Sequence, residues 1–104
     1  MERDTIAEIA IDDAGQLHVV PSSRAFPHVY REGMDVHWNA ERRSLHSPPP
    51  REWSYPRWFA QLLAAARAQG CDLQVNPDTR WSNIEPSLQA EFLQVARDGT
   101  ALDR

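Results

Sequence analysis

The sequence contains a single cysteine, no lysine, four glycines and no long apolar run. The lone cysteine, Cys71, excludes an intramolecular disulfide and fits a reducing compartment. No glycine-rich phosphate loop, zinc-ligand spacing or nucleophile elbow occurs. No stretch approaches the roughly 18 apolar residues of a membrane span, and the N-terminus does not resemble a signal peptide. We therefore expect a cytoplasmic protein with no membrane segment, no cofactor and no bound metal.

The length and composition indicate one globular domain over residues 1–104. Hydrophobic residues make up 41% and charged residues 25% of the chain, which argues against disorder throughout. A chain of this size can build a core without metal or disulfide staples. The polar ends, residues 1–5 and 100–104, are expected to be loose.

The charge is unevenly distributed, and every cationic residue other than histidine is arginine. Residues 41–67 carry five arginines against two carboxylates, a net +3, within a chain of net charge −4. One explanation is a GC-rich genome, which favours arginine codons. The other is recognition of an anion by the planar guanidinium group. The overall acidity argues against a general affinity for nucleic acid.

The strongest secondary-structure signal is a helix within residues 53–70. Ser54 is a suitable N-cap, Pro56 fits the first turn, and Gly70 can adopt the left-handed conformation past the end. The apolar side chains recur at helical spacing and predict one buried stripe. That stripe consists of Tyr55, Phe59, Leu62, Leu63 and Ala66.

Two β-hairpins are predicted before this helix. Residues 6–11 and 17–20 read as strands around a turn at 12–15, and residues 34–38 and 43–47 read as strands around a loop at 39–42. Residues 24–33 are compatible with either a helical turn or the start of a strand.

Residues 71–75 read as a further strand, followed by a polar loop over 76–84 and a second helix that Pro86 opens and Gly99 ends. The second helix has an apolar stripe of Leu88, Phe92, Val95 and Ala96. The element order is therefore four strands, a helix, a strand and a helix. This order predicts an α+β fold, a mostly antiparallel sheet of about five strands with two helices on one face.

The first candidate site is a polar patch on the second hairpin. With a loop at 39–42, Asp35 faces His46 and His37 faces Ser44, so all four side chains share the sheet face away from the helix. Two imidazoles, a carboxylate and a hydroxyl can perform acid–base chemistry or bind a metal. The alternative is the solvated face of a half-exposed sheet.

The second candidate site is an aromatic and basic cluster at the start of the long helix, which consists of Arg51, Trp53, Tyr55, Arg57 and Trp58. Half-exposed Trp, Tyr and Arg side chains carry interface energy and stack on planar ligands. Packing of Trp53 as a hydrophobic staple and of Trp58 at the sheet edge is the alternative. Arg80 and Trp81 form a third candidate, with Trp81 either lining a pocket or anchoring its loop.

Three further residues are assigned no functional role. We expect Cys71 to be a small buried hydrophobe. His18 and His28 have no recognisable partner in the sequence and are expected at the surface.

Two stretches, residues 31–38 and 51–55, resemble the small bacterial proteins encoded on mobile gene cassettes of integrons. No catalytic pattern accompanies this resemblance. It implies an accessory protein of unknown activity and leaves a homo-oligomer open.

These observations lead to a non-catalytic ligand-binding or protein-interaction module, one version of which neutralises a basic partner such as a toxin. Its expected partner is a second copy, another protein, or a small anionic or planar ligand. The alternatives are a small enzyme that uses Asp35, His37, Ser44 and His46, and a single-stranded nucleic-acid binder that uses the arginines and tryptophans.

Overall fold

The computed structural model describes the backbone of residues 1–102 and the side chains of residues 1–98. Its elements, in chain order, are β1 (Glu2–Ile11), β2 (Leu17–Pro21), the 3₁₀ helix η1 (Val29–Arg31), β3 (His37–Asn39), β4 (Ser44–His46), α1 (Tyr55–Ala68), β5 (Cys71–Gln74), β6 (Arg80–Ser82) and α2 (Pro86–Leu102). Residues 103 and 104, the end of the tail predicted to be loose, lie outside the described residues. None of the described helices is long and apolar enough to cross a bilayer.

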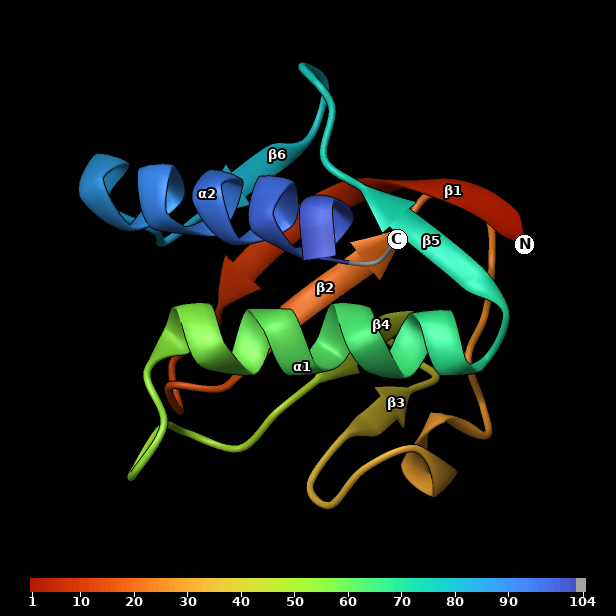
Figure 1. The fold of residues 1–104 in the computed structure, drawn as a ribbon. Helices are drawn as coiled ribbons and strands as arrows, with labels where there is room; N and C mark the ends of the chain where they lie inside the picture. Colours follow the sequence, from red (N-terminus) through yellow and green to blue (C-terminus); the bar gives the residue numbers. More distant parts are fainter. Residues whose placement is uncertain (103–104) are drawn as a thin grey trace.

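The strands form one sheet in the order β3-β4-β2-β1-β5, and β6 also pairs with β1. The β1/β2, β2/β4 and β3/β4 pairs are antiparallel, whereas β5 and β6 run parallel to β1. The two α-helices lie side by side in front of this sheet (Figure 1). The predicted α+β class is confirmed, with six strands in place of about five.

Helix α1 begins and ends where its capping residues predict. The Ser54 hydroxyl accepts a hydrogen bond from the amide of Arg57 at 3.3 Å, and Pro56 lies in the first turn, where no intrahelical donor is needed. Gly70 has a φ of +89°, a conformation that a side chain would strain. These local signals were sufficient to predict both ends of α1, because each one acts within a single helical turn.

The core joins both hairpins to both helices, as the helical stripe predicts. Phe59 and Leu62 of α1 are fully buried in one cluster with Val36 and Leu45 from the second hairpin. Phe59 also contacts Phe92 of α2, with ring centroids 4.8 Å apart. Side chains alternate along each strand, so the face of β2 and β4 that carries Leu45 is the face that α1 covers.

The prediction that residues 1–5 are loose is wrong. Residues 2–5 belong to β1 and pair in parallel with β5. The side chain of Arg24 secures this end, because it pairs with Glu2 and donates to the carbonyl of Gln69 at 2.6 Å. A polar strand of this kind is recognisable only once its partner strand has been placed.

The polar loop predicted over 76–84 also needs correction, since β6 lies within it and pairs with residues 8–10 of β1. Between β5 and β6, the buried Thr79 hydroxyl donates to the carbonyl of Ile6 at 2.6 Å. That contact lies where β1 has a bulge between Ile6 and Glu8. The predicted second helix is confirmed, but it continues through Gly99 to Leu102.

The second hairpin is shorter than predicted, and its register differs. His37 pairs with His46 and Trp38 with Leu45, so the loop occupies 40–43. Met34 is 86% exposed and Asp35 has a φ of +63°, which places both in a turn before β3. Of the two alternatives for residues 24–33, the structure contains the helical turn, η1.

Candidate functional site

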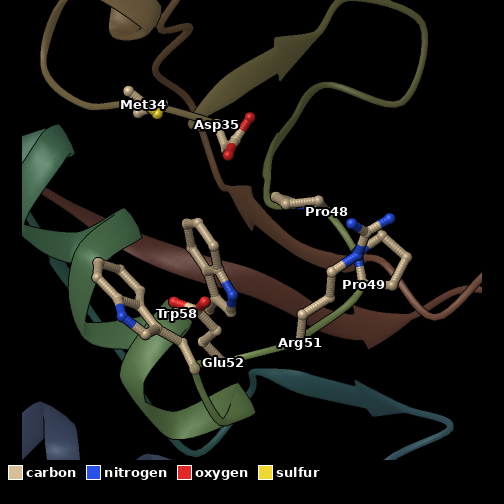
Figure 2. A pocket seen from close by; sticks show the side chains of 8 residues that line it. Met34, Asp35, Pro48, Pro49, Arg51, Glu52 and Trp58 are labelled. Atoms are coloured by element: carbon tan, nitrogen blue, oxygen red, sulfur yellow. The ribbon is translucent and has the colours of Figure 1, made fainter.

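A cavity of about 560 Å³ opens where α1 begins. Its lining comes from three segments: the turn before β3, the proline-rich connection that follows β4, and the first turns of α1 (Figure 2). We call it the aromatic cavity and define it by Met34, Asp35, Pro48, Pro49, Arg51, Glu52, Trp53 and Trp58. Because consecutive prolines restrict the backbone to extended conformations, the connecting wall is stiff.

The two tryptophans of the aromatic cavity contact each other. The ring centroids of Trp53 and Trp58 lie 4.7 Å apart, with an interplanar angle of 49°. The guanidinium carbon of Arg57 lies 4.4 Å from the centroid of the Trp53 ring, a cation–π contact. Both indoles are half-buried, so they are fixed in place and still present surface to the cavity.

Three charged side chains line the same cavity, namely Asp35, Arg51 and Glu52. All three are exposed, and within the described part of the chain none of them makes a side-chain hydrogen bond or an ion pair. Their charges are therefore available to a ligand. This arrangement contrasts with Arg24 and Arg67, which are engaged with carboxylates elsewhere in the fold.

The other predicted binding residues lie outside the cavity lining. The Tyr55 hydroxyl donates to the carbonyl of Gly15 at 2.8 Å, and partial burial followed by the charge of Asp12 raises the pKa of Tyr55. Trp81 of β6 stacks on Phe92, with centroids 6.1 Å apart and planes at 11°. The structure thus places Trp81 as an anchor between β6 and α2, and exposed Arg80 is beside it.

A second group of polar side chains crosses the sheet from β2 to β3. His18 pairs with His46, and His46 pairs with His37, so three imidazoles stand in one line. The centroids of neighbouring rings are 5.4 Å apart in both contacts. We call these three residues the histidine row. By alternation they point to the sheet face opposite Leu45 and α1.

His18 is 2% exposed and is held on both sides by hydrogen bonds. Its Nε2 lies 2.7 Å from Asp12 Oδ2, and its Nδ1 lies 2.8 Å from Ser44 Oγ. Partial burial acts to raise the pKa of Asp12, but hydrogen bonds from His18 and from two backbone amides outweigh it, so this pKa is lowered. An ionised carboxylate only accepts, so Nε2–H donates to Asp12 and a neutral His18 accepts from the Ser44 hydroxyl at Nδ1.

This chain of hydrogen bonds has the residue types of a catalytic relay, with the two ring nitrogens exchanged. Ser44 is 0% exposed, however, so its hydroxyl has no surface on which to meet a substrate. The relay therefore joins β2 to β4 and to the turn after β1. The expectation that His18 lies at the surface is wrong, whereas His28 is exposed as expected.

For the buried Nδ1 of His46, at the centre of the histidine row, residues 1–98 offer no hydrogen-bond partner. Burial, followed by the neighbouring His18 and His37, lowers the pKa of His46, and Asp12 acts weakly in the opposite direction. Burial also raises the pKa of the Cys71 thiol, and Cys71 is buried as predicted. Both shifts favour the neutral form of the group.

The polar patch predicted on the second hairpin is therefore assembled in part. His37, Ser44 and His46 do share one face. His37 pairs with His46 and not with Ser44 as predicted, and a shift by an even number of residues leaves each side chain on its predicted face. The predicted pairing of Asp35 with His46 is wrong, because Asp35 lies in the turn that lines the aromatic cavity. Among the residues with described side chains, no three His, Cys, Asp or Glu groups converge as metal ligands.

Sequence reasoning missed four lining residues of the cavity: Met34, Pro48, Pro49 and Glu52. Met34 was predicted only as part of the strand over residues 34–38. Glu52 had a usable signal, because it lies between two predicted binding residues, Arg51 and Trp53. The burial of His18 also had a usable sequence signal, since Asp12, its hydrogen-bond partner, lies six positions before it across the turn of a predicted hairpin.

Comparison with known proteins identifies one family. The family model of Integron Cassette Protein Hfx_Cass5 matches residues 4–79, a range that contains the aromatic cavity and the histidine row. A solved structure of an integron cassette protein, Hfx_Cass5, from the mobile metagenome of North West Arm Sewage Outfall is 48% identical. It covers 93% of this chain and 98% of its own, with a TM-score of 0.48. Among curated proteins there is no match. The resemblance read from residues 31–38 and 51–55 is thus confirmed, and the chain belongs to the Hfx_Cass5 family of integron cassette proteins.

Proposed function

We propose that this integron cassette protein is a non-catalytic binding module that takes a small, flat ligand into the aromatic cavity. The observation that carries the proposal is the paired indoles of Trp53 and Trp58, half-buried in a cavity whose charged side chains have no partner among the described residues. Fixed aromatic surface beside free charge is the arrangement that small-molecule sites use to combine affinity with orientation.

The size and rigidity of the cavity support this proposal. Its volume of about 560 Å³ falls within the roughly 300–1,000 Å³ of known ligand sites. Trp53 is held by Trp58 on one side and by Arg57 above its ring, so little side-chain freedom is left to lose on binding. An aromatic ligand gains about 0.5–1.5 kcal/mol per ring contact beyond its buried area.

The histidine row does not support an enzyme in the same way. Ser44, which bonds to His18, is completely buried, and both ring nitrogens of His18 already have hydrogen-bond partners inside the protein. A catalytic group needs an atom that can reach the substrate. The binding function therefore rests on the aromatic cavity alone.

Fluorine NMR of protein labelled with fluorotryptophan tests the proposal with residue resolution. The chain has four tryptophans, two in the cavity and two outside it, so each titration contains its own control. Benzyl alcohol is the probe, because it is flat and uncharged. We expect it to shift the signals of Trp53 and Trp58 and to leave those of Trp38 and Trp81 in place.

Two variants sharpen the experiment. Trp58→Ala removes half of the aromatic surface and is expected to weaken benzyl alcohol binding by about tenfold or more. Trp81→Phe alters a tryptophan outside the cavity and is expected to leave the affinity unchanged. Equal shifts of all four signals, or an unchanged affinity of the Trp58→Ala protein, would contradict a site in the aromatic cavity.

A further inference from the structure

We infer that the aromatic cavity selects an organic cation, a small molecule that joins a flat apolar body to one ammonium group. This inference rests on the proposed binding function and adds the charge of the ligand. It narrows the expectation of an anionic or planar ligand, since it keeps the planar body and reverses the sign of the charge.

The first argument is the balance of charge around the cavity. Asp35 and Glu52 contribute two carboxylates against the single guanidinium of Arg51. Figure 2 shows the two carboxylates on different walls of the cavity, with Asp35 on the turn before β3 and Glu52 on the segment before α1. The Arg51 side chain extends to the other side, toward Pro49. The side chains that line the cavity therefore carry a net charge of −1, and the guanidinium of Arg57, which contacts Trp53, is not part of this lining.

The second argument is that an indole of this cavity already holds a cation. The guanidinium of Arg57 lies 4.4 Å from the centroid of the Trp53 ring. The negative face of an aromatic ring attracts guanidinium and ammonium groups alike, and tryptophan does so most strongly. A ligand ammonium between the carboxylates and the indoles receives the same attraction together with two opposite charges.

The third argument is the backbone of Asp35, whose φ of +63° lies in the left-handed region. A side chain rarely adopts this conformation, although aspartate tolerates it better than most residues. Neither a hydrogen bond nor an ion pair of the Asp35 side chain explains it within the described structure. The same residue lines the cavity, and backbone conformations of this uncommon kind cluster at ligand sites.

Three probes that share one ring separate the effect of charge from that of shape. They are benzyltrimethylammonium, benzyl alcohol and phenylacetate, each titrated into the whole protein and followed by the fluorine signals of Trp53 and Trp58. We expect the cation to bind about tenfold tighter than the alcohol, and phenylacetate to bind most weakly. Added salt is expected to weaken the binding of the cation, to reduce the repulsion of phenylacetate, and to leave the binding of benzyl alcohol nearly unchanged.

The double variant Asp35→Asn, Glu52→Gln removes both negative charges and keeps the shapes of the side chains. We expect it to bind benzyltrimethylammonium about tenfold more weakly and benzyl alcohol as before. Glu41→Gln, an exposed carboxylate of the 40–43 loop that does not line the cavity, is the matched control and is expected to change neither affinity.

The outcomes distinguish this inference from the function on which it rests. Binding of phenylacetate or benzyl alcohol as tight as that of the cation overturns the assignment of charge and leaves the binding site standing. An unchanged cation affinity in the double variant also overturns it. If none of the three probes moves the Trp53 and Trp58 signals up to about 10 mM, the binding function itself is overturned.

Discussion

The histidine row and the aromatic cavity both contain the residue types of functional sites, yet they use them in opposite ways. In the histidine row, both ring nitrogens of His18 form hydrogen bonds, one with Asp12 and one with Ser44, and Ser44 is buried. In the cavity, Asp35, Arg51 and Glu52 make no ion pair with any described residue. The difference teaches that residue type alone does not identify a site, because a ligand can bind only atoms that the fold has left unpaired.

The same difference should appear in stability. A buried polar group that loses its partner costs the full desolvation of that group, whereas an exposed charge without a partner contributes little to folding. Changes in the histidine row should therefore reduce stability, and changes in the cavity should alter binding. The following measurements test this contrast, beginning with the largest expected effect.

The largest effect is expected from His18→Ala. The substitution leaves the buried Ser44 hydroxyl without a partner and opens a void between β2 and β4, which should cost about 3 kcal/mol. Urea unfolding followed by tryptophan fluorescence measures the loss. His28→Ala is the control, since that imidazole is exposed, and should change stability by less than about 0.5 kcal/mol. Equal losses of unfolding free energy in the two variants would contradict a structural role for the buried His18.

Acid is expected to weaken the fold through His46. Its pKa is lowered from the ordinary 6.5 in the folded protein, so the unfolded chain binds the proton more readily. The stability associated with a neutral His46 is present above pH 6.5 and is lost as the pH falls through the lower folded pKa. One proton limits the slope to about 1.4 kcal/mol per pH unit.

Urea midpoints measured between about pH 7.5 and 5 test this dependence. His46→Gln removes the titrating group, so the profile of the variant should be flatter over this window than that of the natural protein. A profile that keeps its full slope in His46→Gln would assign the acid sensitivity to another group.

Asp35→Gly is expected to raise stability and to reduce binding. Glycine adopts a positive φ without the steric cost that a side chain pays, so the free energy of unfolding should rise by about 0.5–1 kcal/mol. The affinity for benzyltrimethylammonium should fall, since one carboxylate is gone. Asp35→Asn retains a residue that tolerates this conformation and should leave stability nearly unchanged. A loss of stability in Asp35→Gly would mean that the aspartate side chain supports the fold.

The smallest effect on stability is expected from Arg51→Gln and Glu52→Gln. Neither side chain has an ion-pair partner within the described structure, so each change should stay within about 0.5 kcal/mol. Asp12→Asn, which disturbs the hydrogen bond to His18, should cost more, about 1–2 kcal/mol. Comparable losses in all three variants would show that the cavity charges also hold the fold together.

The parts of the fold that could be predicted are those whose cause lies nearby in the chain. Ser54, Pro56 and Gly70 define the ends of α1, and each acts within one helical turn. The first hairpin is of the same kind, since the Asp12 carboxylate accepts hydrogen bonds from the amides of Ala14 and Gln16 in its own turn. Asx turns of this type are readable from sequence.

For the second hairpin, the loop predicted from local sequence patterns is displaced by one residue. The predicted loop of 39–42 has the right length, but the structure shifts it by one position to 40–43. Asn39 stays in β3, and its side chain accepts from the amide of Arg42 at 3.0 Å, which closes the turn one residue later. The faces of His37 and His46 survived this error because the strand period is two.

The candidate site could be predicted only in outline. The indoles and guanidinium groups at the start of α1 were recognised, and three of them, Arg51, Trp53 and Trp58, line the cavity. The opposite wall, with Asp35, comes from a turn before β3 that was predicted as strand. No local pattern connects that turn to α1, because the contact depends on how the sheet and helix pack.

By itself the sequence determined the helices, the first hairpin, the apolar faces and the family, because capping, turn chemistry and side-chain periodicity act over a few residues. The tertiary structure alone decided which polar groups found partners in distant segments of the chain. It paired residues 2–5 with β5 and joined His18 to Ser44 across 26 positions. It also placed Asp35 and Glu52 in one cavity with two indoles, without a partner in the part of the chain that the structure describes. The physical reason is that a hydrogen bond or an ion pair forms between groups that are close in space, and closeness between distant segments exists only after the chain has folded.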